Sequence, residues 1–137
     1  MEIEFPIEFL VRGTPVSLQA KGKKSRAEWK ARVKFASVVA LPEAHFASRE
    51  SMAVTLYYFP DAAMQGDVDN IVKPILDALS RHIYVDDGQV ERIVVQKFEP
   101  GGVFVFRQPT NIFTEALGGQ RPILYVRVSN DPFEELS

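Results

Sequence analysis

The chain has 137 residues, of which 46% are hydrophobic and 25% charged, with a formal net charge of −2 and no cysteine. This size predicts one globular domain over residues 1–137, and the lack of cysteine excludes disulfides, thiolate nucleophiles and cysteine metal sites. No apolar run approaches the roughly 18 residues that cross a bilayer, and the N-terminus lacks a basic leader region, so we expect a cytoplasmic protein with no membrane contact.

The first third of the chain predicts a strand followed by a basic helix. Apolar residues alternate from Ile3 to Val11, the period of a half-buried strand, and Pro6 favours an edge position. A polar loop covers Thr14 to Lys24. The next four residues, Ser-Arg-Ala-Glu, have the form of a capping box and open a helix predicted from about Ser25 to Leu41.

The rest of the chain predicts alternating strands and helices. The predicted elements are a buried strand Met52–Phe59, a helix from about Asn70 to Arg81 with Pro74 in its first turn or at a kink, strands Arg92–Phe98, Val103–Arg107 and Ile123–Val128, a hairpin turn at Pro100–Gly102, and a short helical turn within Gln108–Gln120. These elements predict a small α+β (mixed α/β) domain in which two main helices pack on one mixed sheet. The acidic C-terminal residues 130–137 are expected to fray.

Charge is distributed unevenly along the sequence. Between residues 12 and 34 there are eight basic residues and one acidic residue, whereas residues 60–91 contain seven acidic and two basic ones. A basic flank beside an acidic centre is typical of a phosphate-binding surface around a metal site, and a solvated helix face is the plainer interpretation. The candidate phosphate-contacting residues, which would serve a nucleic-acid partner, are Arg12, Lys21, Lys23, Lys24, Arg26 and Lys30.

Five aspartates lie within residues 66–88, and each has a structural explanation when taken alone. One carboxylate of the Asp67/Asp69 pair suits the cap of a helix. The Asp86–Asp87 pair precedes a glycine and suits a turn. Lys73 stands four residues from both Asp69 and Asp77, the spacing of an ordinary helical ion pair.

Taken together, the two acidic pairs predict a metal site. They flank one predicted helix, and a strand connection after that helix would bring the second pair beside the first. Oxygen-only clusters suit magnesium, and two such ions can activate a water and stabilise the leaving oxygen of a phosphodiester. A lysine at the rim would offset developing negative charge.

The order and spacing of these residues resemble a known family. The strings Asp67-Val-Asp-Asn-Ile-Val-Lys-Pro-Ile-Leu-Asp-Ala-Leu79 and Tyr84-Val-Asp-Asp-Gly-Gln-Val90 resemble the core of RusA-type Holliday-junction resolvases. The resemblance implies a homodimeric endonuclease that depends on Mg²⁺, or Mn²⁺ in its place, needs no organic cofactor and nicks opposing strands of a four-way DNA junction symmetrically. Such an enzyme would serve DNA recombination and repair.

The same resemblance implies roles for individual residues. Asp67, Asp69 and Asp87 match the metal-binding and catalytic carboxylates, Lys73 matches the catalytic lysine, and Asp86 is a further candidate metal ligand. Asn70 and Gln89 match family positions, and we interpret them as orienting or hydrogen-bonding residues behind the metal ligands.

Other interpretations remain open on sequence alone. The substrate could be another branched or flapped DNA. From a different class of function, the chain could be a catalytically silent module that binds branched DNA or serves a partner protein. The acid cluster could also be purely structural.

Overall fold

The structure is a computed structural model and describes residues 1–16, 22–64 and 66–136. Its elements follow in the order β1 (Ile7–Arg12), α1 (Lys23–Ser37), the 3₁₀ helix η1 (Val38–Ala40), β2 (Met52–Phe59), the 3₁₀ helix η2 (Val68–Ile71), α2 (Val72–Leu79), the 3₁₀ helix η3 (Asp87–Gln89), β3 (Val90–Lys97), α3 (Asn111–Gly118) and β4 (Ile123–Ser129). Within the described residues, no helix is both long enough and apolar enough to span a membrane.

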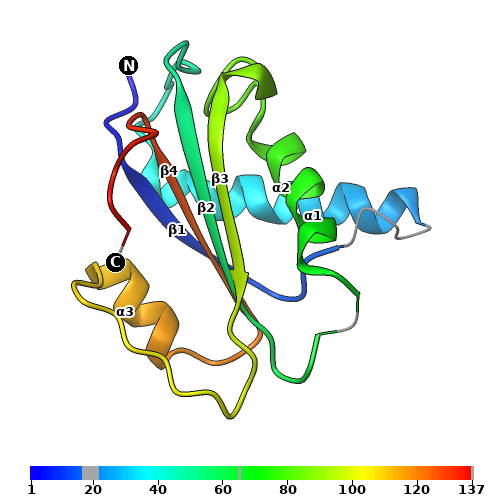
Figure 1. Cartoon of the computed structure of the whole chain (residues 1–137). Helices are drawn as coiled ribbons and strands as arrows, with labels where there is room; N and C mark the ends of the chain where they lie inside the picture. The colour runs from blue at the N-terminus through cyan, green and yellow to red at the C-terminus, as the bar shows by residue number, and fades with distance from the viewer. Residues whose placement is uncertain (17–21, 65, 137) are drawn as a thin grey trace.

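The four strands form one mixed sheet in the order β1-β4-β2-β3 (Figure 1). Strand β4 pairs antiparallel with both β1 and β2, whereas β2 and β3 run parallel. Parallel neighbours need a crossover connection, and here the chain makes it through η2 and α2. The predicted α+β class is confirmed.

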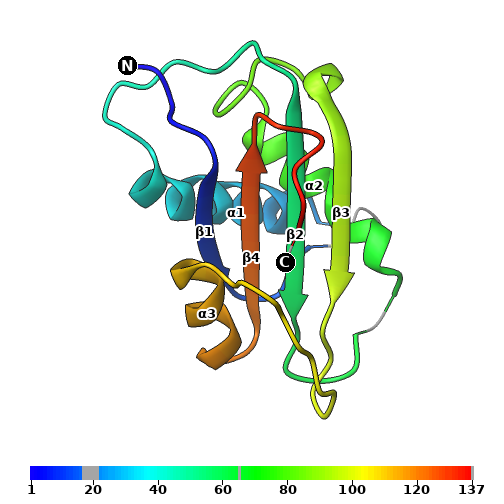
Figure 2. The same ribbon diagram turned by 60° about the vertical axis from the view of Figure 1, so that its left-hand side comes forward.

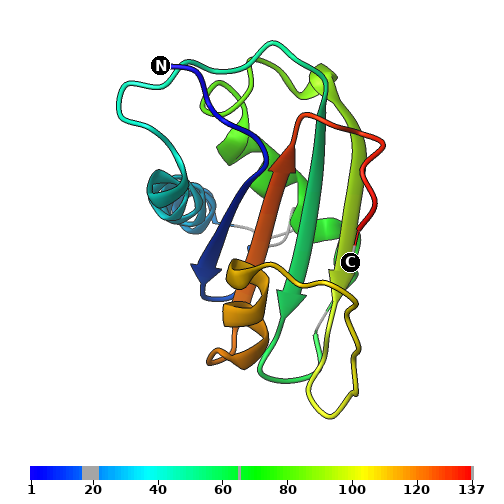
Figure 3. The ribbon, with the colours of Figure 1, turned by 90° about the vertical axis from the view of Figure 1, so that its left-hand side faces the viewer.

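The two faces of the sheet have separate hydrophobic cores. Helices α1 and α2 cover one face, and α3 and the C-terminal segment lie on the other (Figures 2 and 3). Successive side chains of a strand point to opposite faces, so in β2 Val54 and Leu56 join the first core whereas Tyr57 and Phe59 join the second. All eight residues of β2 are therefore buried, which explains its unbroken apolar sequence.

Several predicted elements are confirmed closely. The central strand β2 has the bounds expected from the sequence. Strand β1 lies at the edge of the sheet, as Pro6 indicated, although it begins only at Ile7. Pro74 is the third residue of α2 and thus lies in its first turn, where its missing N–H leaves no helical hydrogen bond unmade.

The predicted capping box at Ser25 is wrong. Helix α1 begins at Lys23, and Gly22 is its N-cap with an extended backbone and no side-chain cap hydrogen bond. Ser25 and Glu28 are therefore already inside the helix, where their side chains have no role as caps. The α-helix also ends at Ser37, and the last expected turn is the 3₁₀ helix η1.

The predicted strand over residues 103–107, and with it the hairpin, is also wrong. The segment belongs to no strand, and Val103 and Val105 are 92% and 90% exposed. The alternating aromatic residues pack elsewhere: the Phe106 ring lies 4.5 Å from that of Phe113 on α3, and the Phe104 ring lies 4.8 Å from that of Phe98. Their periodicity thus reflects an aromatic cluster under α3 rather than pairing in the sheet.

The helical turn expected within residues 108–120 is a full helix, α3. The hydroxyl of Thr110 caps it by accepting a hydrogen bond from the backbone N–H of Phe113 at 3.1 Å. This third α-helix adds to the two that the sequence predicted to pack on the sheet.

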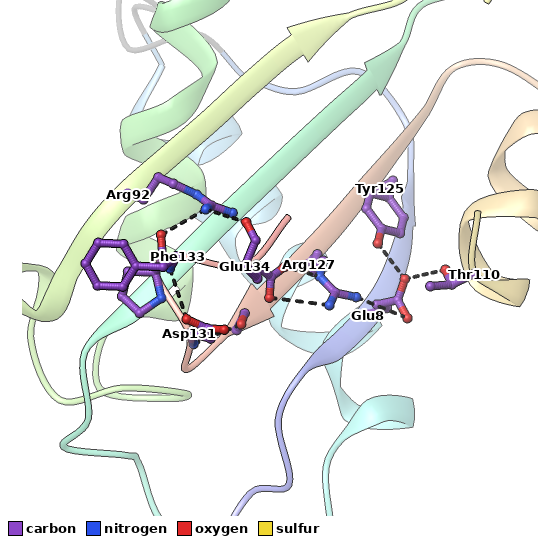
Figure 4. Close-up of polar contacts among 10 residues, drawn as sticks. Glu8, Arg92, Thr110, Tyr125, Arg127, Asp131, Phe133 and Glu134 are labelled. Atoms are coloured by element: carbon purple, nitrogen blue, oxygen red, sulfur yellow. Dashed lines mark hydrogen bonds and ion pairs between the residues drawn. The ribbon is translucent and has the colours of Figure 1, made fainter. Parts of the chain in front are cut away.

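The C-terminal segment is held against the sheet by bonds to residues 130–134, so the prediction that it frays is wrong for those residues. The Arg127 guanidinium donates to Glu134 from Nε at 2.6 Å, and Arg92 Nη1 donates to the backbone oxygens of Pro132 and Glu134 at 2.8 Å each (Figure 4). The sequence showed these charges but not that they face one another across the sheet.

Candidate active site

The two segments that carry the acidic pairs meet at α2. Residues 67–79 form the start of the crossover after β2, and residues 84–90 return the chain from α2 into β3. An ion pair of 2.7 Å between Lys73 Nζ and Asp87 Oδ2 joins the two segments directly. The second acidic segment thus returns to Lys73 on α2, whereas the expected approach of one aspartate pair to the other stays a prediction.

Lys73 lies between two carboxylates. Its Nζ is 2.9 Å from Asp77 Oδ1 as well as 2.7 Å from Asp87 Oδ2. The hydrogen bonds that its ammonium donates to Asp77 and, second, to Asp87 raise the pKa of this lysine above its ordinary value, so it carries a full positive charge throughout the physiological range. The alternative pair with Asp69 does not form, because the lysine points along the helix toward Asp77.

Both carboxylate oxygens of Asp87 have a partner. Its Oδ1 accepts a hydrogen bond of 3.1 Å from the Tyr84 hydroxyl, while its Oδ2 accepts from Lys73. Tyr84 is fully buried, whereas the Asp87 side chain is 31% exposed. The carboxylate therefore stands at the boundary between the core and solvent.

Asp67 and Asp69 are exposed and their carboxylates are unengaged. Asp67 is the N-cap residue of η2, but its side chain makes no cap hydrogen bond, and Asp69 lies in the first turn of η2. Neither carboxylate has a hydrogen bond or ion pair to another described residue. The structure therefore shows no helix cap by this pair, and the carboxylate oxygens of both residues remain available to bind a cation.

Asp86 and Gln89 organise the second acidic loop. Asp86 Oδ2 accepts from the Gly88 N–H at 2.9 Å, and Gln89 completes a capping box by accepting from the Asp86 N–H with its Oε1. The Gln89 amide also donates to the backbone oxygens of Ser48 and Glu50 at 2.9 and 2.8 Å. These bonds fix η3 to the segment that precedes β2. The turn interpretation of Asp86 is confirmed, and the side chain of Asn70 makes no comparable contact among the described residues.

The donor set fits a hard cation in its chemistry. Asp67 and Asp69 offer free oxygens, and Asp87 already holds a cation, the Lys73 ammonium, on one oxygen. Among the residues that the structure describes, however, no three acidic or histidine side chains lie close enough together to hold one metal ion. The carboxylates thus fit a divalent cation by their chemistry, but they are not assembled into one ligand set among the described residues.

A hollow of about 250 Å³ adjoins Asp67. Its lining includes Thr14 and Pro15 from the turn after β1, Tyr58 from β2, and Met64 from the loop before η2. The turn after β1 therefore stands beside the first acidic segment, although some fifty residues separate them in sequence.

The candidate DNA-contacting residues lie along two elements. Lys23, Lys24, Arg26 and Lys30 belong to the N-terminal part of α1, which extends beyond α2 on the side where the chain leads into η2 (Figure 1). Arg12 ends β1 and donates from Nη1 to the backbone oxygen of Gln120 at 3.5 Å. Lys21 lies outside the described residues.

Sequence reasoning missed Tyr84 as a contact of the site. It treated this tyrosine only as part of a motif, and it interpreted Asp77 only as one half of a helical ion pair. The spacing of three residues between Tyr84 and Asp87 was the available signal, but whether a tyrosine hydroxyl turns toward a neighbouring carboxylate depends on how its ring packs.

Residues 14–106 match the model of the protein family described as Endodeoxyribonuclease RusA. The matched range contains both acidic segments, Lys73 and the basic part of α1. No curated protein matches the chain.

Proposed function

Because the chain belongs to the RusA endodeoxyribonuclease family, a family of nucleases, we propose that it is a divalent-metal-dependent enzyme that resolves four-way DNA junctions by paired symmetric nicks. Its biological process would be recombination or repair of DNA. The observation that carries the proposal is the Lys73–Asp87 ion pair, because it joins the two acidic segments of the family motif at an exposed position.

Asp67, Asp69 and Asp87 would hold Mg²⁺ or Mn²⁺, with Asp86 as a further candidate, and the bound cation would supply an activated water and stabilisation of the leaving oxygen. Asp86 already uses Oδ2 to cap η3, whereas the carboxylates of Asp67 and Asp69 make no hydrogen bond or ion pair to another described residue. Gln89 would act by fixing the backbone of the loop that presents Asp87.

Lys73 would stabilise negative charge that develops on the phosphate during cleavage. A permanent cation aimed at such charge typically contributes a factor of about 10² to 10³ to the rate. Asp77 supports this role because it holds the ammonium independently of Asp87, at 2.9 Å.

The basic residues of α1 would bind phosphates of the DNA arms near the acidic site. Lys24 makes only a long, solvent-exposed contact of 4.0 Å with Glu28, so its charge remains available to DNA. A homodimer would present two equivalent sites to the two equivalent scissile strands of a junction.

The test is cleavage of an end-labelled synthetic four-way junction beside matched duplex and flap DNA, with Mg²⁺ or chelator, by the wild type and Asp69→Asn. We expect paired nicks that require both Mg²⁺ and Asp69. Cleavage of flap or duplex DNA alone would support a nuclease activity but contradict the four-way junction as its substrate. Tight junction binding without any cleavage would contradict the proposal and favour a DNA-binding module.

A further inference from the structure

Tyr84 links the hydrophobic core to the candidate metal ligand Asp87. Its ring is fully buried and belongs to the first core, beneath α1 and α2. The hydroxyl lies 3.1 Å from Asp87 Oδ1 and 3.3 Å from the backbone oxygen of Leu76. A phenol has one proton to donate, and the charged, nearer carboxylate is the stronger acceptor, so the hydroxyl donates to Asp87.

The hydroxyl is a permanent donor. The carboxylate of Asp87 has only acceptor oxygens, so a bond of 3.1 Å between it and the phenol oxygen is one in which the phenol donates its proton. The ring has no room to turn away, because it is fixed in a packed core.

The two oxygens of Asp87 are therefore held very differently. Oδ1 is bound by a neutral hydroxyl from the rigid interior, whereas Oδ2 is bound by the ammonium of Lys73, whose side chain is 52% exposed. Exposed ion pairs are weak and exchange readily with solvent and ions. Oδ2 is thus the oxygen of Asp87 at which one cation can replace another.

We propose that Tyr84 is a positioning residue that fixes the Asp87 carboxylate through Oδ1, so that a divalent cation binds at Oδ2 in place of the Lys73 ammonium. The inference rests on the proposed function. It adds the role of Tyr84, the Asp87 oxygen that binds the metal ion, and the displacement of the Lys73 ammonium by that ion. Hydrogen-bonding partners behind a metal ligand commonly change metal affinity by about 10- to 100-fold when removed.

The decisive variant is Tyr84→Phe, which deletes the hydroxyl and keeps the buried ring. Tyr125→Phe is the matched control, because its hydroxyl also donates to a carboxylate, Glu8 at 2.5 Å, but within the polar network shown in Figure 4, on the face of the sheet that carries α3. Ca²⁺ binding to each purified protein is measured by calorimetry without DNA, and junction cleavage is measured as a function of Mg²⁺ concentration. Urea unfolding of both variants reports whether their folds remain intact.

We expect Tyr84→Phe to weaken Ca²⁺ binding by about 10- to 100-fold and to raise the half-saturating Mg²⁺ concentration similarly, while cleavage at saturating Mg²⁺ returns close to the wild-type rate. Tyr125→Phe should match the wild type in both measurements. If the wild type binds Ca²⁺ and cuts DNA, but Tyr84→Phe has unchanged affinity, the inference is overturned and the proposed function stands. If the wild type neither binds Ca²⁺ nor cuts DNA, both the inference and the proposed function are overturned.

Discussion

At the scale of single residues, the Lys73 ammonium affects two properties of the candidate site, metal binding and cleavage. It lies on Asp87 Oδ2, where it neutralises a carboxylate that would otherwise attract a metal ion, and it is also the cation expected to assist cleavage. The same side chain should therefore oppose metal binding and support the chemical step.

Replacing Lys73 by methionine should move these two properties in opposite directions. Cleavage should fall by about 10² to 10³ because the stabilising charge is lost. Ca²⁺ affinity should rise by up to about fivefold, since the exposed ion pair that competes with the metal contributes at most about 1 kcal/mol. Calorimetry and junction cleavage measure the two effects.

Lys97→Met provides the control for Lys73→Met. Lys97 also pairs with a carboxylate, Glu99 at 3.1 Å, but it ends β3, at the opposite end of that strand from the loop that carries Asp87. Both properties should remain at wild-type values in that variant, because Lys97 has no contact with Asp87. A Lys73→Met protein that binds Ca²⁺ more weakly than the wild type would show that the lysine does not compete for Asp87.

At the scale of elements, Gln89 determines where η3 stands. Its side chain accepts from the N–H groups of Val85 and Asp86 and donates to two backbone oxygens in the segment before β2. Four bonds from one amide thus connect segments about forty residues apart and place Asp87 opposite α2.

Gln89→Ala should lower the free energy of unfolding by about 1–3 kcal/mol, because it leaves several backbone groups without a partner. Asn70→Ala is the comparison, since the Asn70 side chain makes no hydrogen bond to another described residue. Urea denaturation followed by circular dichroism measures both variants. Equal stability of the two would contradict a structural role for Gln89.

At the scale of the whole molecule, the C-terminal segment closes a polar network that crosses the sheet. Glu8 on β1 lies 3.7 Å from Arg127 on β4, Arg127 binds Glu134, and Arg92 on β3 binds the backbone of the same segment (Figure 4). The Glu134 side chain is only 13% exposed. Burial raises the pKa of Glu134, but hydrogen bonds with Arg127 and Ser129 and the charges of Arg127 and Arg92 together lower the pKa overall.

Glu134→Gln should destabilise the protein by about 1–3 kcal/mol at pH 7, because it leaves the half-buried Arg127 with less compensating charge. Since the pKa of Glu134 is lowered on folding, this contribution is present above its unfolded pKa and is lost as the pH falls through the folded value. The difference between wild type and variant should therefore shrink between about pH 5 and pH 3. Urea titrations at each pH measure it.

Glu135→Gln, one residue further along, is the matched control. That side chain is exposed and has no ion pair among the described residues, so its removal should leave stability unchanged at every pH. If both variants behaved alike, the C-terminal segment would not be fixed by Arg127.

The sequence by itself determined the elements whose pattern is local and the identity of the acidic segments. The unbroken apolar run of β2, the edge position of β1 and the place of Pro74 in α2 follow from periodicity and backbone chemistry within a few residues. The family motif likewise lies in two short strings, and the match over residues 14–106 confirms the family that they indicated.

Only the tertiary structure decided which groups face one another. It placed Lys73 on Asp77 and Asp87 rather than on Asp69, and it brought the Tyr84 hydroxyl to Asp87. In the structure, the aromatic residues near 104–106 pack in a cluster under α3 and do not form a strand. Contacts between distant segments depend on packing of the whole chain, and an alternating pattern records that one side of a segment is buried but not what buries it.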